Sequence, residues 1–178
     1  MDEKFQQIKR RYERFYRKFR EKSQYPVADT EKGIWGYADT DSLFQFFKDI
    51  HLEKYGSFVD IGSGDGKVVL IAALFGVKAV GIEYDKDLID VSNDIKQELN
   101  LDAEFIQGDY LEQNLSDYDI IFINPDKGFH LKVEEKLLKD MKDTTILYVY
   151  NELFQPRFLE KISKLWYNQI PVIEYRKR

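Results

Sequence analysis

Two carboxylates and three glycines within one short run carry the clearest chemical signal in this chain of 178 residues. Residues 58–66 read Phe-Val-Asp-Ile-Gly-Ser-Gly-Asp-Gly, an apolar stretch that ends in Asp60 and opens into a loop containing Asp65. Glycine lets the polar atoms of a ligand approach the bare backbone. The carboxylates disfavour a pyrophosphate and favour a ligand with a positive charge. We therefore expect this loop to bind a small cationic ligand with an amino group.

The spacing of the glycines argues against two common phosphate-binding loops. A dinucleotide-binding fingerprint has glycine at its first, third and sixth positions, and the sixth position counted from Gly62 is Lys67. A P-loop has Ser or Thr after Gly-Lys, and here Val68 follows. An apolar segment precedes the loop and a helical pattern, residues 67–75, follows it. This order of strand, glycine loop and helix is typical of a nucleotide-binding corner.

The pattern D-x-G-x-G-x-G resembles motif I of the class I S-adenosylmethionine-dependent methyltransferases. The resemblance implies S-adenosyl-L-methionine as the cofactor, with the loop passing close to its methionine part. An ordinary tight turn between a strand and a helix is the alternative. The residues that the resemblance assigns to cofactor binding are Asp60, Gly62, Ser63, Gly64 and Gly66.

Three further residue pairs or triplets are candidate site residues because each follows an apolar segment. Glu83 comes about 20 residues after Asp60, the offset of a carboxylate that binds ribose hydroxyls in such a unit. Tyr84, next to it, could lie along the adenine. The resemblance implies that an acidic residue after the third strand receives the adenine amino group, so we assign Asp109, with the adjoining Tyr110, to cofactor binding. Taken alone, Glu83 is a solvated charge at a strand end and Gly-Asp is a turn signal.

The third of these positions is Asn124-Pro125-Asp126, after the apolar segment 118–123. The resemblance places the methyl acceptor there and implies a catalytic role for Asn124, Pro125 and Asp126. Many amino-group methyltransferases have Asn-Pro-Pro-aromatic at this point, whereas here Asp126 and Lys127 replace the last two residues. The side-chain and backbone carbonyls of Asn124 could orient an amine, and Asp126 could attract it. His130 is a possible proton acceptor, and Phe129 a possible aromatic wall.

Apolar segments of strand type alternate with helical patterns along most of the chain, which predicts an α/β fold. We expect a Rossmann-like, doubly wound, mostly parallel seven-stranded sheet with an antiparallel last strand, plus an N-terminal amphipathic helix. A helix from about residue 157 is also expected. After the strand that precedes the glycine loop, we expect further strands at 77–84, 103–107, 118–123, 145–150, around 166–167 and at 172–175. The other expected helices are at 43–50, 85–99 and 132–141.

The N-terminal segment differs in charge from the rest of the chain. Residues 1–22 contain nine Lys or Arg against four Asp or Glu, although the whole chain has a net charge of −5. Aromatic and apolar residues recur at helical spacing, so the segment is an amphipathic helix. It could pack on an acidic body, contact a substrate or nucleic acid, or lie on a membrane surface. We divide the chain into a basic helix with its connection (1–35) and a methyltransferase domain (36–178), and Trp35 or Tyr37 could help to close the site.

Composition limits the other possibilities. The chain has no cysteine and only two histidines, which argues against disulfides, thiolate chemistry and a metal site. It has no long apolar run, so we expect a cytoplasmic protein without stable membrane insertion.

The branch of the superfamily that this sequence most resembles, in residues 58–110, contains small archaeal protein-lysine methyltransferases and their relatives that act on the c-subunit of mitochondrial ATP synthase. The resemblance implies methyl transfer to an amino nitrogen of a macromolecule, with a protein lysine favoured over RNA or another nucleic acid. A non-catalytic protein that binds S-adenosylmethionine is the third alternative.

Overall fold

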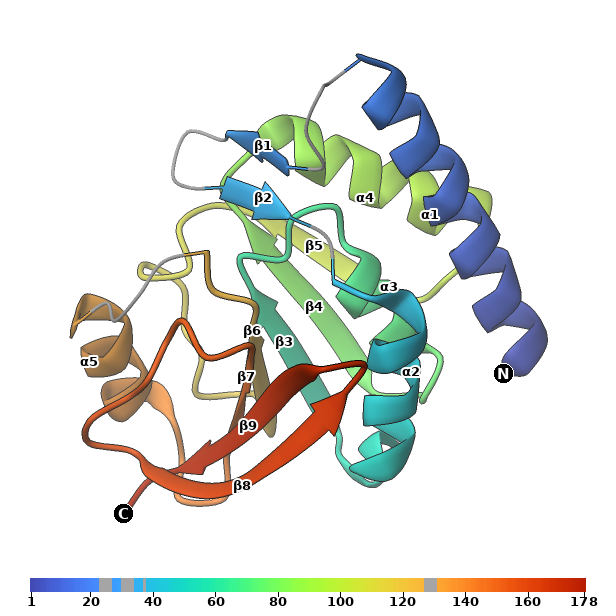
Figure 1. Cartoon of the computed structure of the whole chain (residues 1–178). Coiled ribbons are helices and arrows are strands. Elements are labelled where there is room, and N and C mark those ends of the chain that lie inside the picture. Colours follow the sequence, from blue (N-terminus) through green and yellow to red (C-terminus); the bar gives the residue numbers. More distant parts are fainter. Residues whose placement is uncertain (23–26, 30–33, 37, 127–130) are drawn as a thin grey trace.

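A seven-stranded sheet forms the centre of the computed structural model, which describes residues 1–22, 27–29, 34–36, 38–126 and 131–178 (Figure 1). The strand order is β5-β4-β3-β6-β7-β9-β8. Strand β9 runs antiparallel to both of its neighbours, and the remaining strands are parallel to one another. The predicted Rossmann-like sheet is therefore confirmed. The strands are β3 (Ser57–Ile61), β4 (Lys78–Glu83), β5 (Glu104–Gln107), β6 (Ile120–Ile123), β7 (Ile146–Tyr150), β8 (Glu160–Tyr167) and β9 (Ile170–Arg176).

The central strands are apolar on both faces because helices cover the sheet on both sides. Alternate residues such as Phe58 and Val59 enter two different hydrophobic clusters. Figure 1 shows α1, α2, α3 and α4 on one side of the sheet and α5 on the other. The helices are α1 (Asp2–Lys22), α2 (Thr40–Asp49), α3 (Lys67–Ala73), α4 (Lys86–Glu98) and α5 (Leu131–Asp140), with a short 3₁₀ helix, η1 (Leu52–Lys54).

The order of the strands reverses beside β3. The chain passes from β3 to β4 and β5 on one side, and then returns to β6 on the other side. In a doubly wound sheet, ligands bind at the carboxyl ends of the strands where this reversal occurs. Asp60 is paired in register with Phe122 of β6, two residues before Asn124. The sheet thus brings the glycine loop and the Asn-Pro turn to the same edge.

Helix α1 packs on the domain through its apolar stripe. Phe5, Ile8, Tyr12 and Tyr16 are buried, and the ring of Phe5 stacks on Phe44 of α2 at 3.9 Å. Its basic side faces acidic groups of the body. Arg11 and Arg14 both form ion pairs with Glu98 of α4, at 2.5 and 3.0 Å. These contacts confirm the first of the three interpretations of the N-terminal helix, in which it packs against the domain.

The structure differs from the sequence-based expectation in two places. The helix expected from about Arg157 is wrong, because residues 157–159 form bends and β8 begins at Glu160. Strand β8 pairs with β9 across a tight turn, and this hairpin pairing overrides the preference for a helix. A separate two-stranded hairpin, β1 (Val27–Asp29) with β2 (Ile34–Gly36), was not expected, and the proposed domain boundary at residue 35 falls within it.

Among the described residues, no helix combines the length and the apolar character needed to cross a membrane.

Candidate active site

The loop between β3 and α3 is held against the neighbouring strand by its own backbone. The amides of Gly62 and Ser63 both donate to the carbonyl of Ile82, at 2.9 and 3.0 Å, and Gly66 donates to Ser63 at 3.0 Å. All three glycines of the loop have positive φ angles, from 54° to 77°. Residues with a side chain rarely adopt this conformation. The loop therefore needs glycine at all three positions for its course alone.

The three glycines have different surroundings. A Cβ atom at Gly64 would lie 2.7 Å from the Trp35 ring, and one at Gly66 would lie 2.6 Å from Ser92 Oγ and 2.7 Å from the Phe105 ring. A Cβ at Gly62 would meet no atom of the described residues within 4 Å. The protein's own side chains thus occupy the space beside Gly64 and Gly66. Gly62 is the glycine whose backbone faces open space.

Two buried polar atoms below this loop have no hydrogen-bond partner among the described residues. They are Oδ1 of Asp60 and Oγ of Ser63. Burial raises the pKa of the Asp60 carboxyl well above its usual value, and the negative charges of Glu83 and Asp65 raise it further. An uncompensated buried carboxyl is costly. A cationic ligand that donates hydrogen bonds would compensate it, so these residues fit the ammonium group of S-adenosylmethionine.

Glu83, the candidate for ribose binding, lies at the end of β4 beside the glycine loop. Its Oε2 accepts a hydrogen bond from the Gly64 amide and its Oε1 accepts one from the Asp85 amide, both at 2.9 Å. The two bonds hold the carboxylate in one orientation. Each carboxylate oxygen has a second lone pair. Glu83 can therefore accept from two hydroxyl groups while it keeps its own partners.

The candidates for the adenine end lie near the carboxyl ends of β4 and β5. Tyr84 is 38% exposed and lines an open cavity of about 380 Å³. The other residues that line this cavity are Asp85, Lys86, Asp87, Gln107 and Gly108. Asp109 Oδ1 accepts a hydrogen bond from the Leu111 amide at 2.9 Å, which supports the turn after β5. The structure thus places Tyr84 at an open surface beside Glu83.

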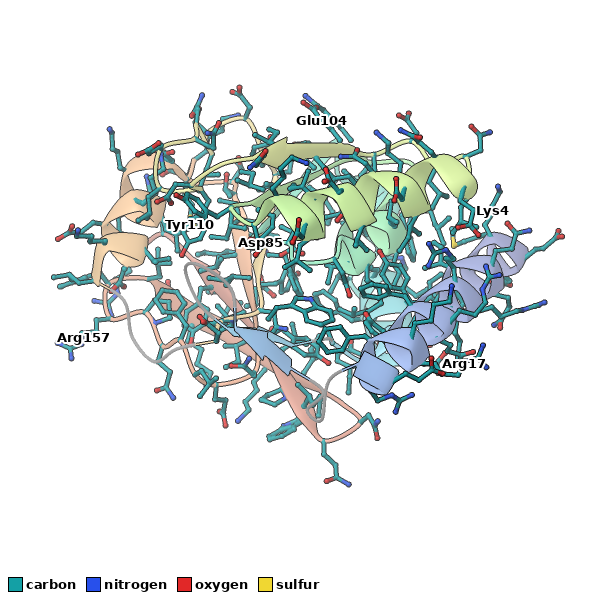
Figure 2. The ribbon with its side chains drawn as sticks, turned by 90° about the horizontal axis from the view of Figure 1, so that it is seen from above. Lys4, Arg17, Asp85, Glu104, Tyr110 and Arg157 are labelled. Carbon is teal, nitrogen blue, oxygen red and sulfur yellow. The ribbon has the colours of Figure 1, made fainter. Side chains whose placement is uncertain are left out.

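Tyr110 relates the two halves of the candidate site. Burial raises the pKa of its phenol, and the carboxylates of Asp109, Asp126 and Glu83 raise it further in that order. The phenol is therefore close to carboxylates from both the cofactor set and the acceptor set. Figure 2 shows Tyr110 between helix α5 and the start of α4, which Asp85 marks. The structure thus brings residues that sequence reasoning had assigned to two separate functions near one side chain.

The Asn-Pro turn after β6 is bound by a residue that the sequence reasoning missed. The side-chain amide of Asn151 donates to Asn124 Oδ1 at 3.0 Å and to the Pro125 carbonyl at 3.2 Å. Asn151 directly follows β7, the strand next to β6. A polar residue immediately after an apolar strand was the signal that could have identified it. Asp126 is exposed beside this turn, and Lys127, Phe129 and His130 lie outside the described residues.

A second missed group connects helix α1 with the glycine loop. Tyr12 donates to the Asp65 carbonyl at 2.7 Å, and Tyr16 donates to the Asp65 carboxylate at 2.6 Å. Buried Lys67 donates to the Ala38 carbonyl and lies over the Tyr16 ring, 4.8 Å from its centre. Burial lowers the pKa of Lys67 to about 8. No spacing rule links residues so far apart in the chain, so the aromatic stripe was the only part of this group that the sequence indicated.

Known methyltransferases resemble this chain in sequence. The family model of the ANTKMT methyltransferase domain matches residues 60–151, just over half of the chain. The human ATP synthase c-subunit lysine N-methyltransferase is 34% identical over 92 residues, which are 51% of this chain and 40% of that protein. The ribosomal protein L11 methyltransferase of Dictyoglomus thermophilum is 22% identical over 129 residues, 72% of this chain and 42% of that protein. The chain thus spans less than half the length of these relatives.

Solved structures share the fold. An RNA methyltransferase from Salinibacter ruber in complex with S-adenosyl-L-homocysteine superposes with a TM-score of 0.66 at 22% identity, covering 80% of this chain and 94% of that one. The Pyrococcus abyssi tRNA (uracil-54, C5)-methyltransferase, also in complex with S-adenosyl-L-homocysteine, gives a TM-score of 0.64 at 14% identity over 79% of this chain and 40% of that one. At these identities the likeness establishes the fold and not the acceptor.

Proposed function

Because the chain belongs to the ANTKMT methyltransferase domain family, we propose that it transfers a methyl group from S-adenosylmethionine to the side-chain amine of a protein lysine. The single observation that carries the proposal is the buried Oδ1 of Asp60, which has no hydrogen-bond partner in the described part of the chain and lies close to the open backbone of Gly62. A cation is the ligand that such a carboxyl favours. When bound, S-adenosylmethionine supplies a methyl group that its sulfonium centre makes electrophilic.

We assign the residues around the glycine loop to holding the cofactor. Asp60 and Ser63 would receive its ammonium group, and Glu83 would accept from its ribose hydroxyls. A hydrogen bond to a charged group contributes about 1.5–3 kcal/mol. Tyr84 would lie along the adenine, and Asp109, with the adjoining Tyr110, would receive its amino group. All of these residues lie at or near the carboxyl edge of strands β3, β4 and β5.

We assign the Asn-Pro turn to the acceptor amine. Asn124 Oδ1 and the Pro125 carbonyl are hydrogen-bond acceptors, and holding an amine in line for attack can lower the barrier by several kcal/mol. A lysine amine has a pKa of about 10.4 and must lose a proton before it can react. The exposed Asp126 carboxylate attracts the ammonium form but opposes its deprotonation. Tyr110 is a poor base, since its raised pKa keeps the phenol protonated. In this proposal the proton leaves to water, since the described residues at this turn offer no better base.

The relatives support a protein acceptor over other amines. Two of them, from human and Caenorhabditis elegans, are named lysine N-methyltransferases of the ATP synthase c-subunit, and the human protein is 34% identical over the matched region. The family match covers the glycine loop, Glu83 and the Asn-Pro turn together. We take the protein lysine from these relatives.

The test is transfer of a radioactive methyl group from labelled S-adenosylmethionine to a cell extract. Label that disappears after protease treatment and persists after ribonuclease treatment supports the proposal, as does recovery of methyl-lysine after acid hydrolysis. The Asn124→Ala variant should lose turnover while its affinity for S-adenosylmethionine stays the same. Absence of transfer by the unaltered protein to any fraction, together with no binding of the cofactor, would refute the proposal.

A nucleic-acid acceptor is the second candidate. The observation in its favour is a groove of about 250 Å³ between α1 and α4 that Arg11, Arg14 and Lys18 line together with Phe15 and Glu98. Glu98 pairs with both arginines and lowers the positive charge of the groove. RNA binding that falls steeply with salt, and that weakens when Arg14 and Lys18 of this groove are replaced by Gln, would favour this candidate.

A further inference from the structure

Asn151 makes two hydrogen bonds to the oxygens that the proposed function assigns to the acceptor amine. Its single side-chain nitrogen donates to Asn124 Oδ1 and to the Pro125 carbonyl. We propose that Asn151 is a positioning residue, which holds these two oxygens in the orientation that receives the amine. This inference rests on the proposed function, because it concerns the same acceptor turn.

The two contacts account for the whole donor capacity of the Asn151 amide. A side-chain amide nitrogen carries two hydrogens, and here each has its own acceptor, at 3.0 and 3.2 Å. One acceptor is a side chain and the other is main chain, and both belong to the turn that follows β6. Asn151 therefore connects the end of β7 with the end of β6 at the edge of the sheet where ligands bind.

Asn151 is itself held from the other side. Its Oδ1 accepts from the Leu153 amide at 2.7 Å, and its backbone amide donates to the Pro171 carbonyl of β9 at 2.8 Å. Its φ of 75° is in the left-handed region, which asparagine tolerates better than most residues. Because both the nitrogen and the oxygen of its side chain are hydrogen-bonded, Asn151 has a fixed orientation and can orient its neighbours.

The chemical consequence lies in the orientation of Asn124. A side-chain amide presents an acceptor at one end and two donors at the other. The Asn151 donors keep the oxygen of Asn124 at their side, and one lone pair remains on this oxygen and on the Pro125 carbonyl for an N–H of the acceptor. Without Asn151 the amide of Asn124 can turn its nitrogen toward the amine. That nitrogen would donate to the lone pair that must attack the methyl group.

Two substitutions separate the side chain from the backbone conformation. Asn151→Gly keeps the left-handed backbone and removes both donors. Asn151→Asp keeps the shape of the side chain but replaces the donor nitrogen by a carboxylate oxygen, which repels the Asn124 and Pro125 oxygens. The matched control is Asn168→Gly, which removes an asparagine with a φ of 47° from the turn between β8 and β9.

We expect the turnover of labelled methyl transfer to fall about tenfold in Asn151→Gly, equivalent to about 1.4 kcal/mol, and further in Asn151→Asp. The affinity for S-adenosylmethionine should stay within about twofold of the unaltered protein in both. Below about pH 5 the Asp side chain gains a proton and a donor, so the ratio of Asp to Gly activity should rise there. Asn168→Gly should show none of these effects.

A second measurement does not need the acceptor. The side-chain amide of Asn124, observed by ¹⁵N NMR, should be ordered in the unaltered protein and in Asn168→Gly but mobile in Asn151→Gly. An ordered Asn124 in Asn151→Gly, or full turnover in that variant, would overturn the role of Asn151 while methyl transfer by the unaltered protein stands. No transfer by the unaltered protein would instead refute the proposed function and, with it, this inference.

Discussion

The hydroxyl of Tyr16 on helix α1 donates a 2.6 Å hydrogen bond to the buried carboxylate of Asp65 in the glycine loop. Tyr12, one turn earlier, donates to the carbonyl of the same residue at 2.7 Å. Two adjacent turns of the N-terminal helix thus hold one residue of the loop at both its main chain and its side chain. Helix α1 therefore supports the candidate cofactor site directly, in addition to covering the core.

Removing the Tyr16 hydroxyl should destabilise the fold more than removing that of Tyr12. Tyr16→Phe loses a hydrogen bond to a carboxylate, worth about 1.5–3 kcal/mol, whereas Tyr12→Phe loses one to a neutral carbonyl, worth about 0.5–1.5 kcal/mol. Both variants keep the ring and its packing. Urea unfolding of the two variants and the unaltered protein measures the difference. Equal losses in the free energy of unfolding would show that the hydrogen bond from Tyr16 to the Asp65 carboxylate is no stronger than the one from Tyr12 to the carbonyl.

Lys67 should make the stability depend on pH in the alkaline range. Burial lowers the pKa of Lys67 from 10.5 to about 8 in the folded protein. Between these values the unfolded chain binds the proton more readily, so this residue's contribution to the free energy of unfolding increases as the pH rises. The gain from pH 7 to pH 9.5 should be about 1–2 kcal/mol.

The substitution that isolates this effect is Lys67→Met. Urea unfolding at several pH values measures the free energy of unfolding of both proteins. As the pH rises across this range, this free energy should increase more for the unaltered protein than for the variant. Lys78→Met, at an exposed lysine, is the control. A pH-independent difference for Lys67→Met would contradict the lowered pKa.

Cofactor binding should release a proton from Asp60. Burial, Glu83 and Asp65 raise the pKa of this carboxyl in the free protein, and a bound cation would lower it. Binding of S-adenosylmethionine should therefore tighten as the pH rises through the raised pKa of this carboxyl. Calorimetric titrations in buffers with different ionisation enthalpies measure the released proton directly.

The variant for this prediction is Asp60→Asn, which preserves the shape of the side chain. We expect its affinity for S-adenosylmethionine to be at least about tenfold weaker at pH 8 and to vary less with pH. Its thermal stability should be unchanged or higher, because the variant no longer buries an ionisable group at residue 60. Unchanged affinity would remove Asp60 from the cofactor site.

Gly62 and Gly76 provide a matched pair. Their φ angles are 76° and 79°, and a Cβ atom at either would meet nothing within 4 Å. Alanine should therefore cost about 1–2 kcal/mol of stability at both positions, through backbone strain alone. Only Gly62→Ala should also weaken binding of S-adenosylmethionine, because only Gly62 lies in the loop that we assign to the cofactor. Equal affinities in the two variants would place the ligand elsewhere.

Glu83 should affect binding both directly and through the loop. Glu83→Ala removes the acceptors of the Gly64 and Asp85 amides, and we expect the affinity for S-adenosylmethionine to fall about tenfold or more. Glu83→Gln keeps one of the two acceptor oxygens, so its affinity for S-adenosylmethionine should lie between that of Glu83→Ala and that of the unaltered protein. The affinity for S-adenosylhomocysteine, which has the same ribose, should fall by a similar factor. A loss restricted to one of the two ligands would contradict a ribose role.

The sequence predicted those features that depend on neighbours in the chain. The glycine loop, the strands with continuous apolar runs and the helix that begins near Asp85 all follow from local pattern, and each is present. The aromatic stripe of α1 predicted an amphipathic helix in the same way. These features were accessible because each one satisfies its own backbone or buries its own apolar face.

The contacts that link distant segments could not be predicted. Nothing in the residues around Asn124 indicates that Asn151 would bind it, since that depends on which strands are neighbours and in what register. The same applies to Lys67, which the pattern assigned only to a helix start and which the fold buries against two tyrosines. Residue 157 shows the opposite error, where pairing of β8 with β9 outweighed the local preference for a helix.

The link between α1 and the glycine loop also sets an order of events in folding. The hydrogen bonds from Tyr12 and Tyr16 to Asp65 span 53 and 49 residues of chain. Contacts of such long separation form late, because the loop between their ends must first lose its conformational freedom. The glycine loop can turn locally as soon as β3 and β4 pair, but its support arrives only when the first helix docks. We therefore expect a refolding chain to gain its secondary structure before it gains its capacity to bind the cofactor.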